Sequence, residues 1–398
     1  MSQFRLSRRS LLFAAGLAPA VLCVPSIALA ADARPPTLVC VFLRGGLDGL
    51  SAVVPFADDD YRRARKSVAI AAPDARKDAA VALNDRFALH PALSPLVDAW
   101  KARHLAVVHA VGSPHPTRSH FEAQDHFEWG ALTATDGHGW LARAATKLSD
   151  ASSLSRIALS RATPLSFRGD PSVVSAPGLE QVGLQAPPRL RDRLESAFGR
   201  VYSSATTPAA RAGRDALKVA RQLRELPSFE SAAKYPQGAK GLADVARLIR
   251  ADVGLRLAWV DSTGWDTHTG QSARLNRNLD ALGRALSAFR DDLGDHLQHT
   301  IVLVMTEFGR TVKENGTGGT DHGHGSVMLA MGGTVDGGKV HGNWPGLSSE
   351  ALYEGRDLAV TTDYRDVFHE VLSRHMRVDG SAALGGYAPA RAVGVVRG

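Results

Sequence analysis

Four apolar runs along the chain each end in a cluster of glycine or polar residues. They span residues 38–43, 105–111, 255–260 and 301–305. Continuous apolar runs of this length are typical of strands that are buried on both faces, as in a parallel sheet. The pattern therefore predicts four strands of such a sheet, each followed by a polar loop.

Helical periodicity appears between these runs. Leucine and phenylalanine recur every three or four residues from 275 to 297, which predicts a long helix with one apolar face leading into the strand at 301–305. Shorter helices are predicted at 92–103 and 119–129. Strands that alternate with helices imply right-handed crossovers, so the expected fold is α/β, a doubly wound, mostly parallel sheet with helices on both faces.

The stretch from about 165 to 250 breaks this alternation. Five prolines mark loops between residues 164 and 188, and charged residues then alternate with Leu, Ala and Val in a helical pattern up to Leu226. This composition predicts a helical insertion or cap on the sheet. Its arginines are expected to form a solvated helix face, with a polyanion-binding surface as the alternative.

The N-terminus carries the pattern of an export signal. Arg8 and Arg9 precede an apolar run at residues 11–30 that ends in Ala-Leu-Ala, and no acidic residue occurs before Asp32. The adjacent arginines predict a twin-arginine signal peptide over residues 1–30. A retained membrane anchor is the alternative, although the run is short and interrupted by proline for a spanning helix.

We therefore expect a mature chain of residues 31–398 that is periplasmic or secreted, engages the twin-arginine (Tat) translocase during export and has no stable membrane span. Removing the signal's three arginines lowers the formal net charge of the 398-residue chain from +7 to +4. This weak charge, with no basic stripe interleaved with aromatic residues, argues against a nucleic-acid partner. Cys23 lies in the signal, which leaves Cys40 as an expected buried, inert thiol.

Side chains that can bind metal or act as nucleophiles follow each predicted strand. In chain order they are Asp48; Ser119 with His115 and His120; Asp266 with His268; and Glu307. Asp321, His322 and His324 form a fifth cluster in a glycine-rich loop before the apolar run 327–331. Ligand sites in open α/β sheets lie beyond the carboxyl ends of the strands, so we expect these loops to converge at one edge.

Single members of this set also have structural interpretations. Asp48, in Gly-Gly-Leu-Asp-Gly, fits a turn aspartate that bonds its own backbone. Asp266 and His268 lie two residues apart, so an extended segment places both on one side, where they suit one cation or a hydrogen-bonded loop pair. Glu307 would alternatively pair with Arg310 or lie at a helix start.

Ser119 opens the predicted helix at 119–129. With Glu122 three residues later it forms a capping-box pattern. The backbone amides and dipole at a helix start would also stabilise a phosphoryl or sulfuryl group on the hydroxyl, and a nearby cation would make it more nucleophilic. No Gly-x-Ser-x-Gly, Walker or Gly-x-Gly-x-x-Gly motif follows the strands, which argues against an ordinary serine hydrolase, an NTPase or a Rossmann dehydrogenase.

Six motifs in chain order resemble the DUF1501 family, exported bacterial proteins of undefined activity placed in the alkaline phosphatase and sulfatase superfamily. They are the twin-arginine signal and the segments 43–50, 119–124, 264–268, 306–311 and 320–325. The resemblance covers nearly the whole chain. It implies an alkaline phosphatase-like sheet with the helical insertion at about 165–250.

The resemblance also implies roles for individual residues. The positions that match metal ligands of the superfamily are Asp48, Asp266, His268 and either His322 or His324. Ser119 matches the nucleophile that opens a helix. At Glu307-Phe308 the sequence departs from the pattern, because superfamily enzymes commonly have Asp followed by His there. One metal site is thus short of a nitrogen ligand unless Asp321 and His322 supply the missing pair.

The expected function is that of a metal-dependent hydrolase acting on a phosphate or sulfate ester, either a small molecule or a polymer. The candidate ligands for one or two divalent ions are Asp48, Asp266, His268, Glu307, Asp321, His322 and His324. Their mixed oxygen and nitrogen donors suit Zn or Mn. Ser119 is the expected nucleophile, and Arg310 or Arg44 would steady the anion. The alternative, favoured by Phe308, is a non-catalytic envelope protein that binds a polymer or a partner.

Overall fold

The computed structural model describes residues 34–133, 136–149, 152–227 and 234–398. The predicted signal peptide lies outside these ranges. None of the helices within them combines the length and the apolar content needed to cross a bilayer.

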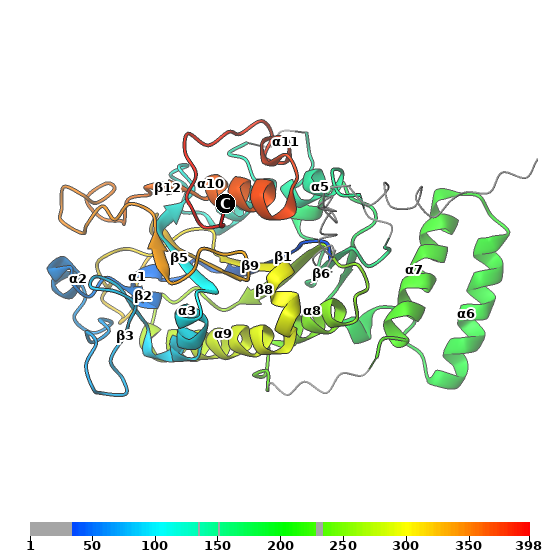
Figure 1. Ribbon diagram of the computed structural model, residues 1–398, viewed down its shortest axis with the longest axis horizontal. Coiled ribbons are helices and arrows are strands. Elements are labelled where there is room, and N and C mark those ends of the chain that lie inside the picture. The colour runs from blue at the N-terminus through cyan, green and yellow to red at the C-terminus, as the bar shows by residue number, and fades with distance from the viewer. Residues whose placement is uncertain (1–33, 134–135, 150–151, 228–233) are drawn as a thin grey trace, which may run out of the picture. The chain divides into compact units, whose positions relative to one another are not determined.

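Nine strands of the described residues form the main sheet (Figure 1). Their order is β11 (Lys339–His341), β5 (Leu105–Gly112), β10 (Ser326–Gly332), β9 (Thr300–Met305), β1 (Thr37–Arg44), β8 (Leu257–Thr263), β6 (Arg156–Leu159) and β7 (Val174–Ala176), with β12 (Thr362–Asp363) also paired to β5. β10 is antiparallel to both neighbours, and the other pairings in this sheet are parallel. The predicted mostly parallel sheet is confirmed, and all four apolar runs are strands. A second, small sheet contains β2 (Val53–Val54), β4 (Ala88–Leu89) and β3 (Val81–Ala82).

Helices lie on both faces of the main sheet and also beyond its ends (Figure 1). They are α1 (Gly49–Ala52), α2 (Asp59–Ala64), α3 (Val97–Lys101), α4 (His120–Trp129), α5 (Trp140–Ala145), α6 (Pro188–Ser203), α7 (Pro208–Arg224), α8 (Lys240–Arg250), α9 (Gln271–Leu293), α10 (Tyr364–Glu370) and α11 (Gly380–Ala383). Short 3-10 segments are η1 (Pro91–Leu96), η2 (Leu165–Phe167), η3 (Leu179–Gln181) and η4 (Gly294–His299), and η5 (Val371–Met376) is a π-helix. Figure 1 shows α8 and α9 on one side of the sheet and α5 and α10 on the other.

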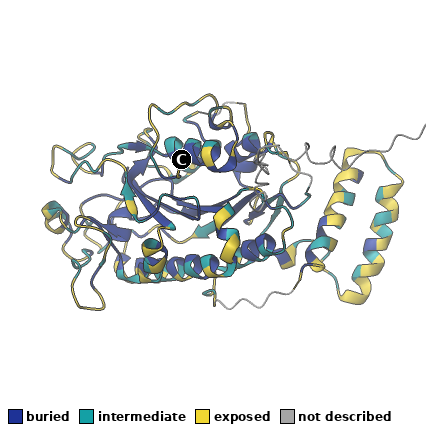
Figure 2. Ribbon diagram, in the orientation of Figure 1, coloured by how far each residue is buried: buried dark blue, intermediate teal, exposed yellow. Residues whose placement is uncertain are grey.

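The alternation of side chains along β1 explains why the protein has a hydrophobic core layer on each face of the main sheet. Val39 and Val41 belong to one core cluster, which includes apolar residues of α8 and α9. Cys40 and Phe42 belong to the other, with residues of α5 and α10. Successive side chains of a strand point to opposite faces, so a strand that is apolar throughout needs cover on both. Figure 2 shows the sheet buried between its helices, and Cys40 is fully buried as expected.

The long predicted helix is confirmed as α9 followed by η4. All of its predicted apolar positions from Leu275 to Leu297 are buried. α9 ends at Gly294, whose φ of +49° favours glycine over other residues. The helix predicted at 92–103 instead begins as the 3-10 segment η1 and continues as α3, because Pro95 within it has no N–H for a helical hydrogen bond.

The 165–250 segment contains both helices and part of the main layers. α6 and α7 pair with each other as an antiparallel hairpin at one end of the sheet (Figure 1). β7, however, extends the main sheet beside β6, and α8 packs against α9 and β8. β7 has only three half-buried residues, which is too short for an alternating pattern to be recognised.

A buried ion pair fixes the loop after β1. Arg65 donates to Asp48 Oδ2 at 2.7 Å and Oδ1 at 2.9 Å, and both side chains are fully buried. Ser51 Oγ donates to Oδ2 at 2.7 Å, and Gln271 Nε2 also donates to it. The carboxylate that the sequence marks as a metal ligand is therefore occupied by protein donors, a role that its glycine-rich loop does not reveal.

Replacing Asp48 with Asn should destabilise the fold strongly. A buried Arg65 without its counter-ion costs about 3–5 kcal/mol in the free energy of unfolding, measurable by denaturant titration. As a control, Asp74→Asn removes the exposed pair with Arg76 and should cost at most about 1 kcal/mol. The Asp48→Asn loss should persist after chelation of metal. If the loss of unfolding free energy disappeared in the presence of chelator, Asp48 would instead be identified as a metal ligand.

The difference in unfolding free energy between wild type and Asp48→Asn should depend on pH. Burial alone raises the pKa of Asp48, but the charge and hydrogen bonds of Arg65 outweigh it and hold the pKa below its ordinary value. The stabilisation is therefore complete above the unfolded pKa of about 3.9 and is lost as pH falls through the lower folded pKa. Denaturant titrations at stepped acidic pH should show the two proteins converging, and a constant difference down to acid unfolding would contradict this.

Candidate functional site

The loops that carry the candidate residues meet at one edge of the main sheet. β5, β9, β1 and β8 run in one direction, and their carboxyl ends lead into the loops beginning at residues 113, 306, 45 and 264. β10 runs the opposite way between β5 and β9, so the loop at 320–325 before it lies at the same edge. The predicted site residues in these loops do not all point toward one common site.

Four side chains form what we call the histidine cluster: His120, Asp266, His268 and His322. His268 Nε2 lies 2.9 Å from His322 Nε2 and 3.0 Å from Asp266 Oδ1. Asp266 Oδ1 lies 3.6 Å from His322 Nε2, and Asp266 Oδ2 lies 3.6 Å from His120 Nε2. Ligands at 2.0–2.1 Å from a tetrahedral zinc ion are about 3.3 Å apart, so these spacings suit one cation.

Each histidine of this cluster is oriented through Nδ1 by an oxygen acceptor. The pairs are His120 with Glu307 Oε1 at 2.7 Å, His268 with Asp321 Oδ1 at 3.1 Å, and His322 with the Arg118 carbonyl at 2.8 Å. Because an ionised carboxylate or a carbonyl only accepts, a proton is assigned to Nδ1, and Nε2 is the nitrogen that can bind a cation. Without a cation, the 2.9 Å contact between the Nε2 atoms of His268 and His322 requires a second proton on one of the two rings. The same arrangement orients histidines that bind metal.

The sequence marks His120 as a metal-competent neighbour of Ser119 but not as one of the candidate ligands. Its Nε2 is buried and has no hydrogen-bond partner among the described residues. A buried polar atom without a partner costs about 1–3 kcal/mol, which a bound cation would offset. The sequence offers one signal, that His120 directly follows Ser119 at a helix start. Its contact with Glu307, 187 residues away, has no local pattern.

Arg310 holds the carboxylate of Asp266 in place. Its donors bond Asp266 Oδ1 at 2.6 Å and the carbonyls of Gly46 at 2.7 Å, Thr320 at 3.1 Å, Trp265 at 3.3 Å and Gly45. The guanidinium is fully buried. The predicted anion-binding role of Arg310 is therefore corrected to a positioning role, because its donors are already engaged within the protein.

Arg44, the alternative anion-binding residue, is likewise engaged. It donates to Asp261 Oδ1 at 2.8 Å, Gln124 Oε1 at 2.7 Å and Glu128 Oε1 at 2.8 Å. Since Gln124 and Glu128 lie on α4 and Asp261 on β8, Arg44 fastens α4 to the sheet. Gln124 also donates to Glu307 at 2.8 Å, which joins this network to the acceptor of His120.

Close backbone packing brings the loop after β1 against the cluster. Gly45 has a φ of +124°, and a Cβ on it would lie 2.5 Å from the backbone nitrogen of Asp266. Only glycine fits there. The Gly45 N–H donates to Glu307 Oε1 at 2.8 Å, so the close approach also supplies a donor to that buried carboxylate.

Phe308 lies against two of the histidine rings. Its ring centroid is 4.8 Å from that of His120 and 5.0 Å from that of His322, and the side chain is buried. Phe308 thus restricts both imidazoles by packing against them, and it offers no ligand atom.

The charges around the cluster suit cation binding. Burial raises the pKa of Glu307, yet hydrogen bonds from His120, Gln124 and Gly45 bring it below the ordinary value. Burial also raises the pKa of Asp266, but the bond to Arg310 and its charge lower it overall. Burial lowers the pKa of His322. Two carboxylates are therefore ionised and His322 is neutral near pH 7, the forms in which these groups bind metal.

Other predicted ligands lie outside the cluster or behind it. His324 is buried, with its ring stacked on Tyr353 at 4.4 Å. His322 and His324 diverge because the two-residue rule applies to an extended strand, and β10 begins only at Ser326. Glu307 and Asp321 contact histidine Nδ1 atoms from the rear and are acceptors in this structure.

Ser119 is exposed and directly precedes α4. The predicted capping box is not formed, because the Ser119 side chain makes no cap hydrogen bond and Glu122 Oε2 instead accepts from Thr117 Oγ1 at 2.5 Å. The hydroxyl is thus left open beside His120, the next residue and a member of the cluster.

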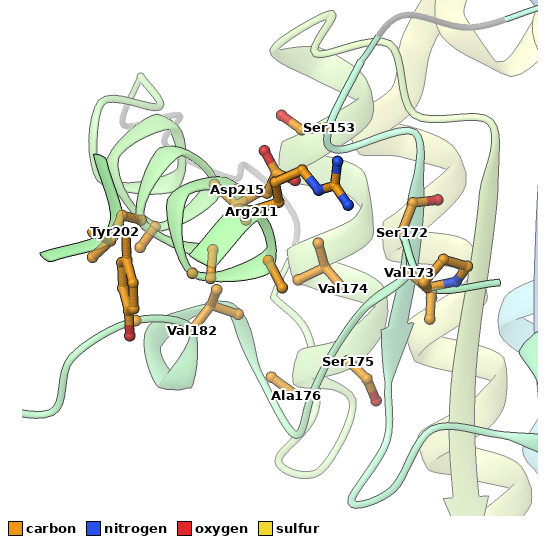
Figure 3. Close-up of a pocket in the computed structure, with 18 of the residues that line it drawn as sticks. Ser153, Ser172, Val173, Val174, Ser175, Ala176, Val182, Tyr202, Arg211 and Asp215 are labelled. Carbon is orange, nitrogen blue, oxygen red and sulfur yellow. The ribbon is translucent and has the colours of Figure 1, made fainter. Parts of the chain in front are cut away.

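A cavity of about 830 Å³ lies away from this edge, between β7 and the α6–α7 hairpin (Figure 3). Its lining is mostly apolar and includes Val174, Val182 and Tyr202, and its charged residues are Arg211 and Asp215. No member of the histidine cluster lines it, so it does not provide the substrate pocket of that site.

Comparison with known proteins places the chain in a family. The search of curated proteins gives no significant match. Among solved structures, alkaline phosphatase from the Antarctic bacterium TAB5 is 11% identical, with 75% of this chain and 92% of that chain covered and a TM-score of 0.30. A mutant of the same enzyme with Mg bound is 9% identical, with 75% and 91% covered and a TM-score of 0.32. Residues 35–384 match the family described as protein of unknown function DUF1501, as the sequence motifs predict, and the chain belongs to that family.

Proposed function

We propose that the protein is a metal-dependent hydrolase of phosphate or sulfate esters, exported by the twin-arginine route to the periplasm or beyond. The observation that carries this proposal is the histidine cluster, in which the ring nitrogens Nε2 gather around one carboxylate while each Nδ1 is held from behind. One ligand atom each from His120, Asp266 and His322 lies within 4.8 Å of the other two, with His268 beside Asp266 and His322, and this set of imidazoles and a carboxylate suits Zn²⁺ or Mn²⁺. When bound, such an ion polarises an ester oxygen as a Lewis acid.

The start of α4 supplies the remaining groups. Backbone amides of residues 120–122 have no acceptor within the helix, and amides at a helix start favour anions. These amides would bind the anion, a role for which Arg310 has no free donors in this structure. Ser119 Oγ would bond to phosphorus or sulfur and lose its proton to solvent while the ester oxygen leaves as an alcohol, and water would then release the acid. Phe121, which is 88% exposed, follows Ser119 by two residues in the chain and would cover an apolar leaving group.

The second candidate function is that of a non-catalytic envelope protein that binds a polymer or a partner. Two observations favour it. Phe308 stands where the superfamily pattern has a histidine, and both candidate anion-binding arginines are engaged inside the protein. In that case the cation would serve the structure and no ester would be turned over.

Metal content should depend on the histidine cluster. We expect His322→Ala to hold one zinc ion per chain fewer than wild type, measured by mass spectrometry after dialysis. Glu307→Gln weakens the acceptor of His120 and should lower zinc affinity about 10–100-fold. His324→Gln is the matched control outside the cluster and should keep the wild-type content. If His322→Ala and wild type held equal amounts of zinc, the histidine cluster would be excluded as the metal site.

Ester hydrolysis should depend on Ser119. The zinc-loaded protein is assayed with aryl phosphates and aryl sulfates, and Ser119→Ala is expected to lower kcat about 100-fold or more, with the metal content unchanged. Ser203→Ala, remote on α6, is the control. Activity indifferent to Ser119→Ala would reject the nucleophile. No turnover by the zinc-loaded wild type, with a Tm that falls on chelation, would select the non-catalytic function.

A further inference from the structure

A second group of potential ligands lies on the far side of α4 from the histidine cluster. His115 comes from the loop after β5, and Glu122 and His126 lie one turn apart on α4. One donor atom from each lies within 4.8 Å of the other two. Glu122 follows His120 by two residues, and positions two apart on a helix do not share a face. The two groups are therefore separate.

The structure shows no direct hydrogen bond between the three side chains. His115 Nε2 is 4.0 Å from Glu122 Oε1, which is too long for a hydrogen bond. The rings of His115 and His126 meet edge to face with centroids 4.5 Å apart. Ligands around a zinc ion are about 3.3 Å apart, so modest side-chain rotation would bring all three into a common shell.

His126 provides the independent sign of a missing ligand. The side chain is 4% exposed, and its Nδ1 is buried with no hydrogen-bond partner among the described residues. The opposite side of the site is open, because Glu122 is about half exposed and His115 about one-third exposed. A buried imidazole that has an unpaired nitrogen and lies beside an exposed carboxylate and a second imidazole is an arrangement that a cation would complete.

We propose that His115, Glu122 and His126 form a second divalent-cation site, distinct from the histidine cluster and independent of the proposed hydrolase activity. Two imidazoles and one carboxylate form a His₂Glu set of the kind that binds zinc with an open position for water. His115 Nδ1 accepts a long, 3.3 Å hydrogen bond from the Thr117 N–H. Binding through Nε2 moves the ring proton to Nδ1 at the loss of that weak bond.

The site would fix the segment between its ligands. Ser119 and His120 lie between His115 and Glu122 in the chain, at the turn from the loop into α4. A cation bound by His115 and by the ligands on α4 would hold both ends of this short segment in place. It thereby restricts the positions of the exposed hydroxyl and of the imidazole that faces the first cluster.

The test is zinc titration of the full mature protein by calorimetry, with cobalt absorption as a second readout. We expect two zinc ions per wild-type chain and one each for His115→Ala and for the double variant His120→Ala/His322→Ala. Adding His115→Ala to the double variant should abolish binding of the remaining zinc ion, or lower its affinity at least 100-fold. His138→Ala, which changes a half-exposed histidine of another loop, is the control and should bind two.

Two results would overturn the second site. One is a folded His120→Ala/His322→Ala protein that binds no zinc, and the other is wild-type stoichiometry in His115→Ala. Circular dichroism establishes that each variant is folded, and the single variant His115→Ala tests the site even if the double variant unfolds. Wild-type stoichiometry in His115→Ala leaves the hydrolase proposal standing, because the first cluster is intact in that variant. Absence of zinc from the double variant also leaves it standing, because the hydrolase proposal requires only that the first cluster bind metal.

Discussion

The buried guanidinium of Arg310 is the contact on which the arrangement at the sheet edge depends. It joins the loop after β1, the loop after β8 and the loop before β10, through the carbonyls of Gly46 and Thr320 and the carboxylate of Asp266. The planar fork of an arginine reaches several acceptors in fixed directions, which a lysine cannot do. One side chain thus positions a candidate ligand and satisfies carbonyls that would otherwise be buried without donors.

The sequence predicted the fold better where patterns are long. The four strands and the apolar face of α9 repeat over enough residues to be recognised, and their order gave the doubly wound sheet. The reversed direction of β10 and the short edge strand β7 escaped prediction. Direction depends on pairing with β5 and β9, which are distant in the chain, and three residues of β7 carry no periodicity.

The site was predicted in part. Asp266, His268 and His322 come together as expected at the carboxyl edge. The sequence does not separate the two roles open to Asp48, because a carboxylate that binds a metal and one that pairs with a buried arginine look alike until the arginine's position is known. His120, noted in the sequence only as a metal-competent neighbour of Ser119, is not among the predicted ligands for a related reason. Its acceptor Glu307 is predicted as a ligand instead, because residue type does not distinguish a metal ligand from a group that orients one.

The reversed strand β10 has a consequence for the order of assembly. The members of the histidine cluster are spread over some 200 residues, from His120 to His322, and the last of them reaches the others only when β10 is inserted between β5 and β9. Such long-range pairing forms late and slowly in folding. A bound ion would therefore be present only in a fully folded molecule. A chain that crosses the membrane already folded would carry an ion that it bound in the cytoplasm, and not whichever metal is most abundant outside.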